Sequence, residues 1–251
     1  MTPLILLPEN KRSDPLKSLC VMPVYNQARE LPELLDKCRK CMPADEFIIV
    51  DNGSSDGSER LIEESGFEFI RLSRNHGVGY ALMIGAEKAL ERGCDIVVYI
   101  AGNGKMLPEE MDRVMDPIKR DDADHVVGSR FLPGGQSPNL PAFRKKAIPL
   151  VVNNVVRILF RTKVTDATNG YRAYRTTLLK DKRVQWQAKW LYHYQFEYYI
   201  YAKALKLGYR SKEVATSMMY PSDGRKYSKI KPIIGWWELL EAWVLVGLGL
   251  K

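Results

Sequence analysis

The sequence predicts an α/β fold built on a mostly parallel sheet with helices on both faces. Between residues 19 and 128, short apolar segments alternate with segments whose apolar residues recur at helical spacing. Two of the apolar segments end in Asp51 and Gly128, which is typical of buried parallel strands followed by tight loops. The chain has 251 residues, of which 45% are hydrophobic, so it can bury the core of one large domain.

Each apolar segment of the first half is expected to form a strand, at residues 19–24, 46–51, 67–72, 95–100 and 125–128. The intervening helices are expected at residues 31–38, 58–65, 77–92 and 108–119. Strands that alternate with helices in this way form parallel sheets. Ligands of such sheets bind outside the carboxyl ends of the strands, so the loops that follow the strands are the predicted functional region.

The second half is less regular. We expect an apolar helix at residues 147–160, an aromatic-rich helix at 190–207 and a strand at 209–217. The domain organisation expected from these patterns is an N-terminal extension (residues 1–17), one α/β domain (18–217) and a basic, amphipathic C-terminal segment (218–251).

Residues 233–250 are rich in Trp and Leu but contain Glu238 and Glu241, and are too short and too charged for a membrane span. They are expected to form an amphipathic helix at a membrane surface, with the preceding lysines facing phosphate head groups: Lys226, Lys229 and Lys231. The alternative is a helix packed on the domain's own core.

The net charge of +8 is unevenly distributed. Residues 140–163 contain six basic side chains and no acidic one, and residues 203–231 contain eight basic side chains against Glu213 and Asp223. This pattern indicates an anionic partner, such as phosphate groups, nucleic acid or an anionic membrane, or else an ordinary solvated surface. Cys38 and Cys41 form a C-x-x-C pair without further Cys or His ligands nearby, so a metal site is not expected there.

Polar residues follow the first two predicted strands. Pro23, Tyr25 and Asn26 come after the first, and Asp51 and Asn52 begin a Gly- and Ser-rich turn after the second. A carboxylate at a strand end can accept hydrogen bonds from a base or ribose, while glycine lets backbone amides approach a ligand. The simpler interpretation of the second motif is a tight turn.

Gly77 and Gly79 open the helix after the third predicted strand, and amides at a helix N-terminus can bind phosphate. In a dinucleotide-binding fingerprint, the Gly-rich turn follows the first strand. The displaced position argues against an NAD-dependent oxidoreductase, which stays as an alternative.

Taken in order, these motifs and the V-G-S-R-F segment that contains Arg130 resemble those of family-2 glycosyltransferases of GT-A fold. The later segment D-A-T-N-G-Y-R-A-Y-R, from Asp166 to Arg175, is similar to D-P-T-S-G-F-R of the dolichol- and polyprenyl-phosphate sugar synthases in that family. Glu197 lies in a short F-E element that this branch shares. The resemblance covers about residues 18–230.

The resemblance implies a nucleotide-sugar site in which Pro23, Tyr25, Asn26, Asp51 and Asn52 hold the base and ribose. It places the following residues near the donor: Gly77, Gly79, Ala101, Gly102 and Asn103. Arg130, Arg172 and Arg175 are expected to face donor or acceptor phosphates, because a guanidinium offers paired donors to phosphate oxygens. Asp166 and Glu197 are the candidate bases if the acceptor is a sugar hydroxyl, whereas a phosphate acceptor needs none.

The sequence departs from the family pattern after the fourth predicted strand. The family has D-x-D-x-Q there, whose oxygens hold a divalent cation on the donor diphosphate, but this chain has Ala101, Asn103 and Lys105 at those positions. Magnesium prefers several hard oxygen ligands. The favoured hypothesis is that no cofactor is used and that the Lys105 ammonium replaces the cation. A catalytically inactive copy, or Mg²⁺ or Mn²⁺ held by the diphosphate and Asn103, are the alternatives.

The expected protein is therefore a glycosyltransferase whose acceptor is polyprenyl phosphate or another anionic or glycan molecule. The resemblance implies an inverting displacement. The four cysteines, interpreted as reduced packing residues, favour a cytoplasmic location, the C-terminal segment favours peripheral membrane contact, and no nucleic-acid partner is expected. The non-enzymatic alternative is a subunit that binds a nucleotide sugar without turnover.

Overall fold

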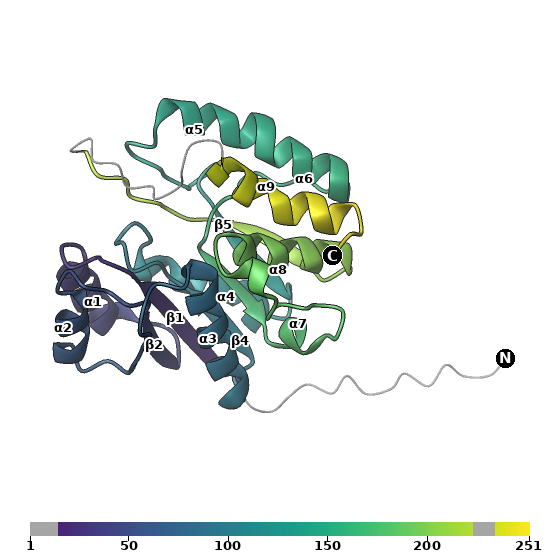
Figure 1. Cartoon of the computed structure of the whole chain (residues 1–251). Coiled ribbons are helices and arrows are strands. Elements are labelled where there is room, and N and C mark those ends of the chain that lie inside the picture. Colours follow the sequence, from purple (N-terminus) through teal and green to yellow (C-terminus); the bar gives the residue numbers. More distant parts are fainter. Residues whose placement is uncertain (1–14, 223–233) are drawn as a thin grey trace, which may run out of the picture.

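A computed structural model describes residues 15–222 and 234–251. In this part of the chain, seven strands form one sheet (Figure 1). The strands are β1 (Ser18–Val24), β2 (Glu46–Asp51), β3 (Phe69–Arg71), β4 (Ile96–Tyr99), β5 (His125–Ser129), β6 (Arg172–Arg175) and β7 (Ser211–Ala215). Their order across the sheet is β3-β2-β1-β4-β6-β5-β7.

Every pairing in this sheet is parallel except those of β6, which runs antiparallel to both β4 and β5. The predicted α/β fold with a mostly parallel sheet is confirmed. Strand β6 was not predicted, because its four residues begin and end in Arg and give no apolar run. The resemblance predicts phosphate contacts for Arg172 and Arg175 but no strand at these residues.

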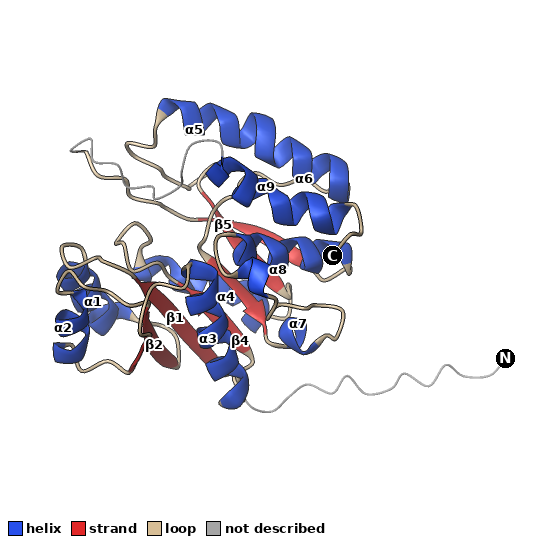
Figure 2. Ribbon diagram, in the orientation of Figure 1, coloured by secondary structure: helices blue, strands red, loops and turns tan. Residues whose placement is uncertain are grey.

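The helices follow the predicted alternation in the first half (Figure 2). They are α1 (Leu31–Cys41), α2 (Ser58–Glu64), α3 (Val78–Glu91) and α4 (Met111–Lys119), the last preceded by the 3₁₀ turn η1 (Pro108–Glu110). In the second half they are α5 (Ala142–Ala147), α6 (Asn153–Phe160), α7 (Thr177–Lys180), α8 (Gln195–Lys206) and α9 (Ile234–Gly247). A π-helical segment, η2 (Ile148–Val152), joins α5 to α6, and the 3₁₀ turn η3 (Lys189–Leu191) precedes α8.

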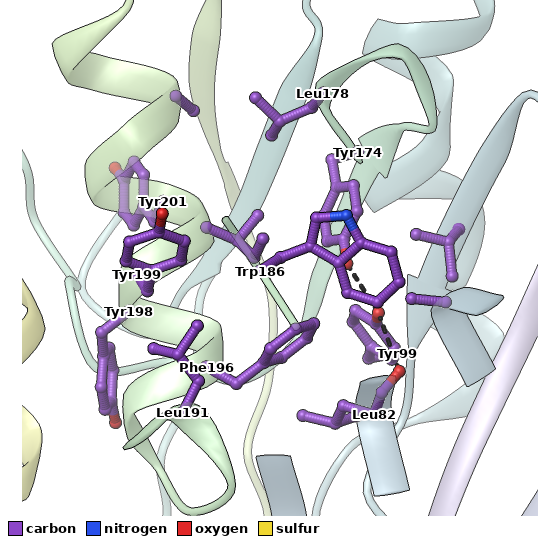
Figure 3. Packing of buried hydrophobic residues seen from close by; sticks show 14 of the residues in the cluster. Leu82, Tyr99, Tyr174, Leu178, Trp186, Leu191, Phe196, Tyr198, Tyr199 and Tyr201 are labelled. Atoms are coloured by element: carbon purple, nitrogen blue, oxygen red, sulfur yellow. Dashed lines mark hydrogen bonds between the residues drawn. The ribbon is translucent and has the colours of Figure 1, made fainter. Parts of the chain in front are cut away.

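Two hydrophobic clusters cover the two faces of the sheet. On one face, α1, α2 and α4 bury residues such as Leu31, Ile62 and Met111. On the other face, α3, α8 and α9 pack around an aromatic centre (Figure 3). There the hydroxyls of Tyr99 and Tyr174 lie 2.6 Å apart, so two buried phenols of neighbouring strands satisfy each other.

The C-terminal helix α9 lies between α8 and the α5–η2–α6 segment, which forms an outer layer of the molecule (Figure 1). Trp243 of α9 is fully buried and meets the rings of Phe160 and Tyr201 edge-on. The core-packing interpretation therefore holds for this face of the helix, whereas Trp237 is 54% exposed. Lys226, Lys229 and Lys231 lie outside the described residues. Among the helices described, none is long and apolar enough to cross a membrane.

Candidate active site

A cavity of about 940 Å³ opens at the carboxyl ends of β1, β2 and β4. This volume is in the range of small-molecule sites. Many of the predicted site residues line the cavity: Pro23, Tyr25, Asn52, Gly77, Ala101, Gly102, Asn103, Lys105, Arg130 and Glu197. Asn26, Asp51, Gly79, Asp166, Arg172 and Arg175 do not line it.

Asn52 uses its whole side-chain amide to brace the loop beside it. Its Nδ2 donates to the carbonyl of Gly77 at 3.0 Å and to Oδ1 of Asn75 at 3.2 Å, and its Oδ1 accepts from the amide of His76 at 3.0 Å. The segment after β3 is thereby fixed against the end of β2. Asn52 therefore has a structural role in the cavity wall, and its contact with the nucleotide stays a prediction.

Asp51 and Asn26 hold the turn that joins β2 to α2. Oδ1 of Asp51 accepts from the amide of Ser54 at 3.0 Å, and Oδ1 of Asn26 accepts from the amide of Ser55 at 2.9 Å. Asp51 is buried, and its Oδ2 lies 3.6 Å from Nε of Arg71. These hydrogen bonds support the simpler interpretation of the motif as a tight turn. Direct contact of Asp51 with a base or ribose stays a prediction.

The two glycines after β3 allow close packing of the chain against itself. A Cβ atom on Gly77 would lie 2.3 Å from the carbonyl oxygen of Tyr192, and one on Gly79 would lie 2.0 Å from that of Leu191. The amide of Tyr80 donates to the same Tyr192 carbonyl at 3.0 Å. Gly77 still lines the cavity, but Gly79 lies beneath the turn before α8, which corrects its expected place beside the donor.

The turn from Ala101 to Lys105 lies where the resemblance predicts a D-x-D-x-Q metal-binding motif. Ala101 and Gly102 have no side-chain oxygen, and Oδ1 of Asn103 accepts a hydrogen bond from the amide of Lys105 at 3.2 Å. This donor set does not fit a divalent cation, which prefers several carboxylate oxygens. Among the described residues, no group of three or more His, Cys, Asp or Glu side chains could hold a metal ion.

Basic side chains converge on this turn, and we call Lys105, Arg130 and Arg144 the basic cluster. All three line the cavity. Lys105 is only 9% exposed, and its Nζ lies 5.4 Å from the centre of the Tyr220 ring. Burial, followed by the charges of Arg144 and Arg130, lowers the pKa of Lys105 to about 8. Such a cluster favours an anionic ligand, because the ligand would relieve the mutual repulsion.

Arg130 forms the best-anchored ion pair of the site. Its Nε and Nη2 each donate to a different oxygen of Asp166 at 2.7 Å, and its Nη1 donates to the Tyr220 hydroxyl at 2.6 Å. Asp166 is fully buried, and both of its oxygens are occupied. Asp166 in this arrangement holds Arg130 in place, and its role as a general base for a sugar-hydroxyl acceptor stays a prediction.

Arg172 is buried behind the cavity wall. Its guanidinium donates to the carbonyls of Asn169, Ala167 and Glu197 and lies 5.1 Å from the centre of the Tyr198 ring. These contacts fold the loop between Asp166 and β6 around the arginine. In this structure its donors serve the backbone, and contact of Arg172 with a phosphate stays a prediction.

Arg175 lies at the end of β6 that is opposite the cavity. Because β6 runs antiparallel to β4, Arg172 pairs with Tyr99 at the end of β4 and Arg175 pairs with Ile96 at its start. Nη2 of Arg175 donates to Asp121 at 2.8 Å, far from the cavity lining. The expected contact of Arg175 with a phosphate is not compatible with this position.

Glu197 lies in the first turn of α8 and lines the cavity. A Cβ atom on Gly170 would lie 2.9 Å from its Oε1, so the absence of a side chain at Gly170 leaves room for this carboxyl group. Burial raises the pKa of Glu197, and the nearby Arg172 opposes that shift. Among the described residues, its carboxyl oxygens make no hydrogen bond, and Glu197 is thus the carboxyl group best placed to meet a ligand.

The structure adds cavity residues that the motifs did not identify, chiefly Arg144, Tyr194, His193 and Tyr220. In the sequence, Arg144 is distinguished only by its place in the acid-free stretch 140–163. A basic side chain on a helix is usually solvated, so no local pattern predicts that Arg144 lines the cavity. Tyr220 follows β7 and reaches the site through its bond to Arg130.

The seven-stranded, mostly parallel sheet with a cavity at its carboxyl edge is an α/β fold similar to that of GT-A glycosyltransferases. A crystal structure of glucosyl-3-phosphoglycerate synthase from Mycobacterium tuberculosis, in complex with Mn²⁺, UDP and glucosyl-3-phosphoglycerate, has a TM-score of 0.66. It is 18% identical, and the match covers 93% of this chain and 80% of that one. Residues 19–182 match the family model of glycosyl transferase family 2, and the chain belongs to this family. It is therefore a nucleotide-sugar-dependent glycosyltransferase, which excludes the NAD-dependent oxidoreductase.

Three relatives are between 30% and 33% identical to this chain over the aligned residues. An undecaprenyl-phosphate mannosyltransferase from Micrococcus luteus is 33% identical, with 66% of this chain and 69% of that protein covered. A polyprenol monophosphomannose synthase from Mycolicibacterium smegmatis is 31% identical, and the match covers 65% of this chain and 63% of that protein. A UDP-N-acetylglucosamine–dolichyl-phosphate N-acetylglucosaminyltransferase from Methanococcus voltae is 30% identical, with 67% and 73% covered.

Proposed function

We propose that this enzyme transfers a sugar from a nucleotide-sugar donor to a polyprenyl phosphate at the cytoplasmic face of a membrane. The observation that carries the proposal is the basic cluster of Lys105, Arg130 and Arg144 around a cavity at the carboxyl edge of the sheet. Both substrates bring phosphate groups to such a cavity. The names of the relatives from Micrococcus luteus and Methanococcus voltae, which act on polyprenyl or dolichyl phosphates, support the same acceptor class.

The reaction requires little acid–base chemistry. An oxygen of the acceptor phosphate forms a bond to the anomeric carbon of the sugar, and the bond from that carbon to the donor phosphate breaks. The electron pair leaves with the nucleotide phosphate. Because the attacking phosphate is already an anion, no proton has to be removed, and this agrees with a site in which Asp166 is occupied by Arg130.

The proposal includes stabilisation of the leaving phosphate without a divalent cation. Lys105 follows Asn103 in the turn that replaces the metal motif, and its ammonium is preorganised by burial and by the ring of Tyr220. A fixed positive charge at the leaving oxygen lowers the barrier because it needs no reorganisation during the reaction. Arg144 supplies further positive charge around it, whereas the charge of Arg130 is balanced by Asp166.

The test is a panel of UDP-, GDP- and CMP-sugars offered with polyprenyl phosphate in detergent or vesicles, with and without EDTA. Chromatography and mass spectrometry of the lipid fraction would detect the glycosylated product. We expect one donor to give a polyprenyl-phosphate sugar at a rate that EDTA leaves unchanged. Tight nucleotide binding without product from any donor would overturn the proposed transfer and favour a binding subunit without turnover.

A further inference from the structure

The outer face of the α5–η2–α6 segment carries an unusual set of exposed apolar side chains. Phe143, Leu150, Val151 and Ile158 are exposed by 68%, 67%, 47% and 74%. Their spacing of seven, one and seven residues places them on one side of the helical segment. Exposed apolar residues scattered singly are ordinary, but a stripe along one helix face indicates an interaction surface.

Basic side chains border this stripe. Lys145, Lys146, Arg157 and Arg161 are exposed, and residues 140–163 include no acidic side chain. Apolar residues on one side with Lys and Arg beside them are the pattern of helices that lie in the plane of an anionic membrane surface. A second copy of the same chain is a poorer fit, because two such basic faces would repel each other.

The inner side of the same segment forms part of the active site. Arg144 and Ile148 line the cavity, and Val152 and Val156 are buried in the core. One helical segment thus has the cavity on its inner side and the apolar stripe on its outer side. Figure 1 shows this segment as the outermost layer, on the side of the molecule that also carries α9. Trp237 of α9, which is 54% exposed, is followed directly by the cavity residues Glu238 and Leu239.

We propose that the α5–η2–α6 segment is the membrane-docking surface of this enzyme, with its apolar stripe in the interfacial region of an anionic bilayer. In this position Arg144 faces the route by which a lipid phosphate enters the cavity. The route of entry rests on the proposed function, because that function requires a lipid acceptor. The docking of the segment on a membrane does not depend on the proposed function. This assignment places membrane contact on residues 142–161, whereas the sequence had suggested residues 218–251.

Co-sedimentation of the full chain with vesicles of phosphatidylglycerol and phosphatidylcholine tests the proposal. Leu150→Ser with Ile158→Ser should lower vesicle affinity by at least about ten-fold. The control is Phe69→Ser on the edge strand β3, which also removes a partly exposed apolar side chain.

A second pair of variants tests the basic side chains beside the stripe. The charge variant is Lys145→Glu with Lys146→Glu, and its control is Lys180→Glu with Lys182→Glu. Each lysine near the surface should contribute about five-fold, and salt should weaken the binding.

Transfer measurements separate this proposal from the proposed function. The Leu150→Ser/Ile158→Ser variant should keep its rate with a short, water-soluble prenyl phosphate and lose rate with vesicle-embedded acceptor. Vesicle binding without any transfer would overturn the proposed function and leave the docking surface standing. Wild-type protein that does not bind anionic vesicles at low salt, or stripe variants that bind as wild type does, would overturn the docking surface. The docking surface would also be overturned if analytical ultracentrifugation showed that the wild-type protein is a dimer and the stripe variants are monomers. A second copy of the chain would then occupy the stripe.

Discussion

Arg130 and Asp166 form a two-pronged ion pair in which Nε and Nη2 of the arginine reach different carboxylate oxygens at 2.7 Å. Both side chains are almost completely buried. The backbone amide of Arg130 also donates to Asp166 at 3.1 Å, and the Tyr220 hydroxyl accepts from the same guanidinium. The pair therefore joins the end of β5, the loop before β6 and the segment after β7 at the edge of the cavity.

Asp166→Ala should lower the free energy of unfolding by about 3–5 kcal/mol, because it leaves a buried guanidinium without its counter-charge. Urea denaturation would measure the change. The matched control is Glu33→Ala, which removes an exposed carboxylate paired with Lys37 at 2.7 Å and should change stability by less than about 0.5 kcal/mol. Equal effects of the two substitutions would contradict the structural role of Asp166.

Lys105→Ala should reduce kcat by about 10²–10³-fold, the scale seen when one preorganised charge-stabilising group is removed. The wild-type rate should survive EDTA, and added Mg²⁺ or Mn²⁺ should not rescue the variant. Lys180→Ala, at an exposed position on α7, is the control for loss of a lysine. A wild-type rate that collapses with chelator and returns with magnesium would show that Lys105 does not replace the cation.

The pH profile should report the same lysine. Burial and the neighbouring arginines lower the pKa of Lys105 to about 8, so the ligand-free enzyme loses this positive charge as the pH rises through about 8. We therefore expect kcat/KM to fall above that pH, and kcat to fall only at higher pH because a bound phosphate stabilises the ammonium. Lys105→Arg should move the basic limb upward, since a guanidinium stays charged. An unchanged basic limb in that variant would assign the titration to another group.

Gly79→Ala should destabilise the protein although the position does not line the cavity. The added Cβ atom would lie 2.0 Å from the carbonyl oxygen of Leu191, so the turn before α8 must move. Thermal unfolding should show a loss well above the roughly 1 kcal/mol expected for Gly208→Ala, where φ is +79° and no atom lies within 4 Å. A loss no greater than that of the control would mean that the turn adjusts easily.

The regular first half of the fold could be predicted because each element carries its own local signal. The apolar run of β2 from Glu46 to Asp51 and the helical spacing of Leu31, Leu34 and Cys38 depend only on neighbours along the chain. The parallel sheet and the position of the site at its carboxyl edge follow from the alternation of those elements. The family motifs also predict many of the residues that line the cavity.

The partners of the charged residues were decided only by the tertiary structure. Arg172 and Arg175 stand three positions apart in one motif, yet the antiparallel direction of β6 sends one to the cavity side of the sheet and the other to the opposite edge. Arg130 meets Asp166 across 36 residues of sequence, and Gly79 meets Leu191 across a still longer interval. Local patterns fix whether a residue lies on a strand or a helix, but hydrogen bonds and ion pairs over such separations depend on how the elements pack.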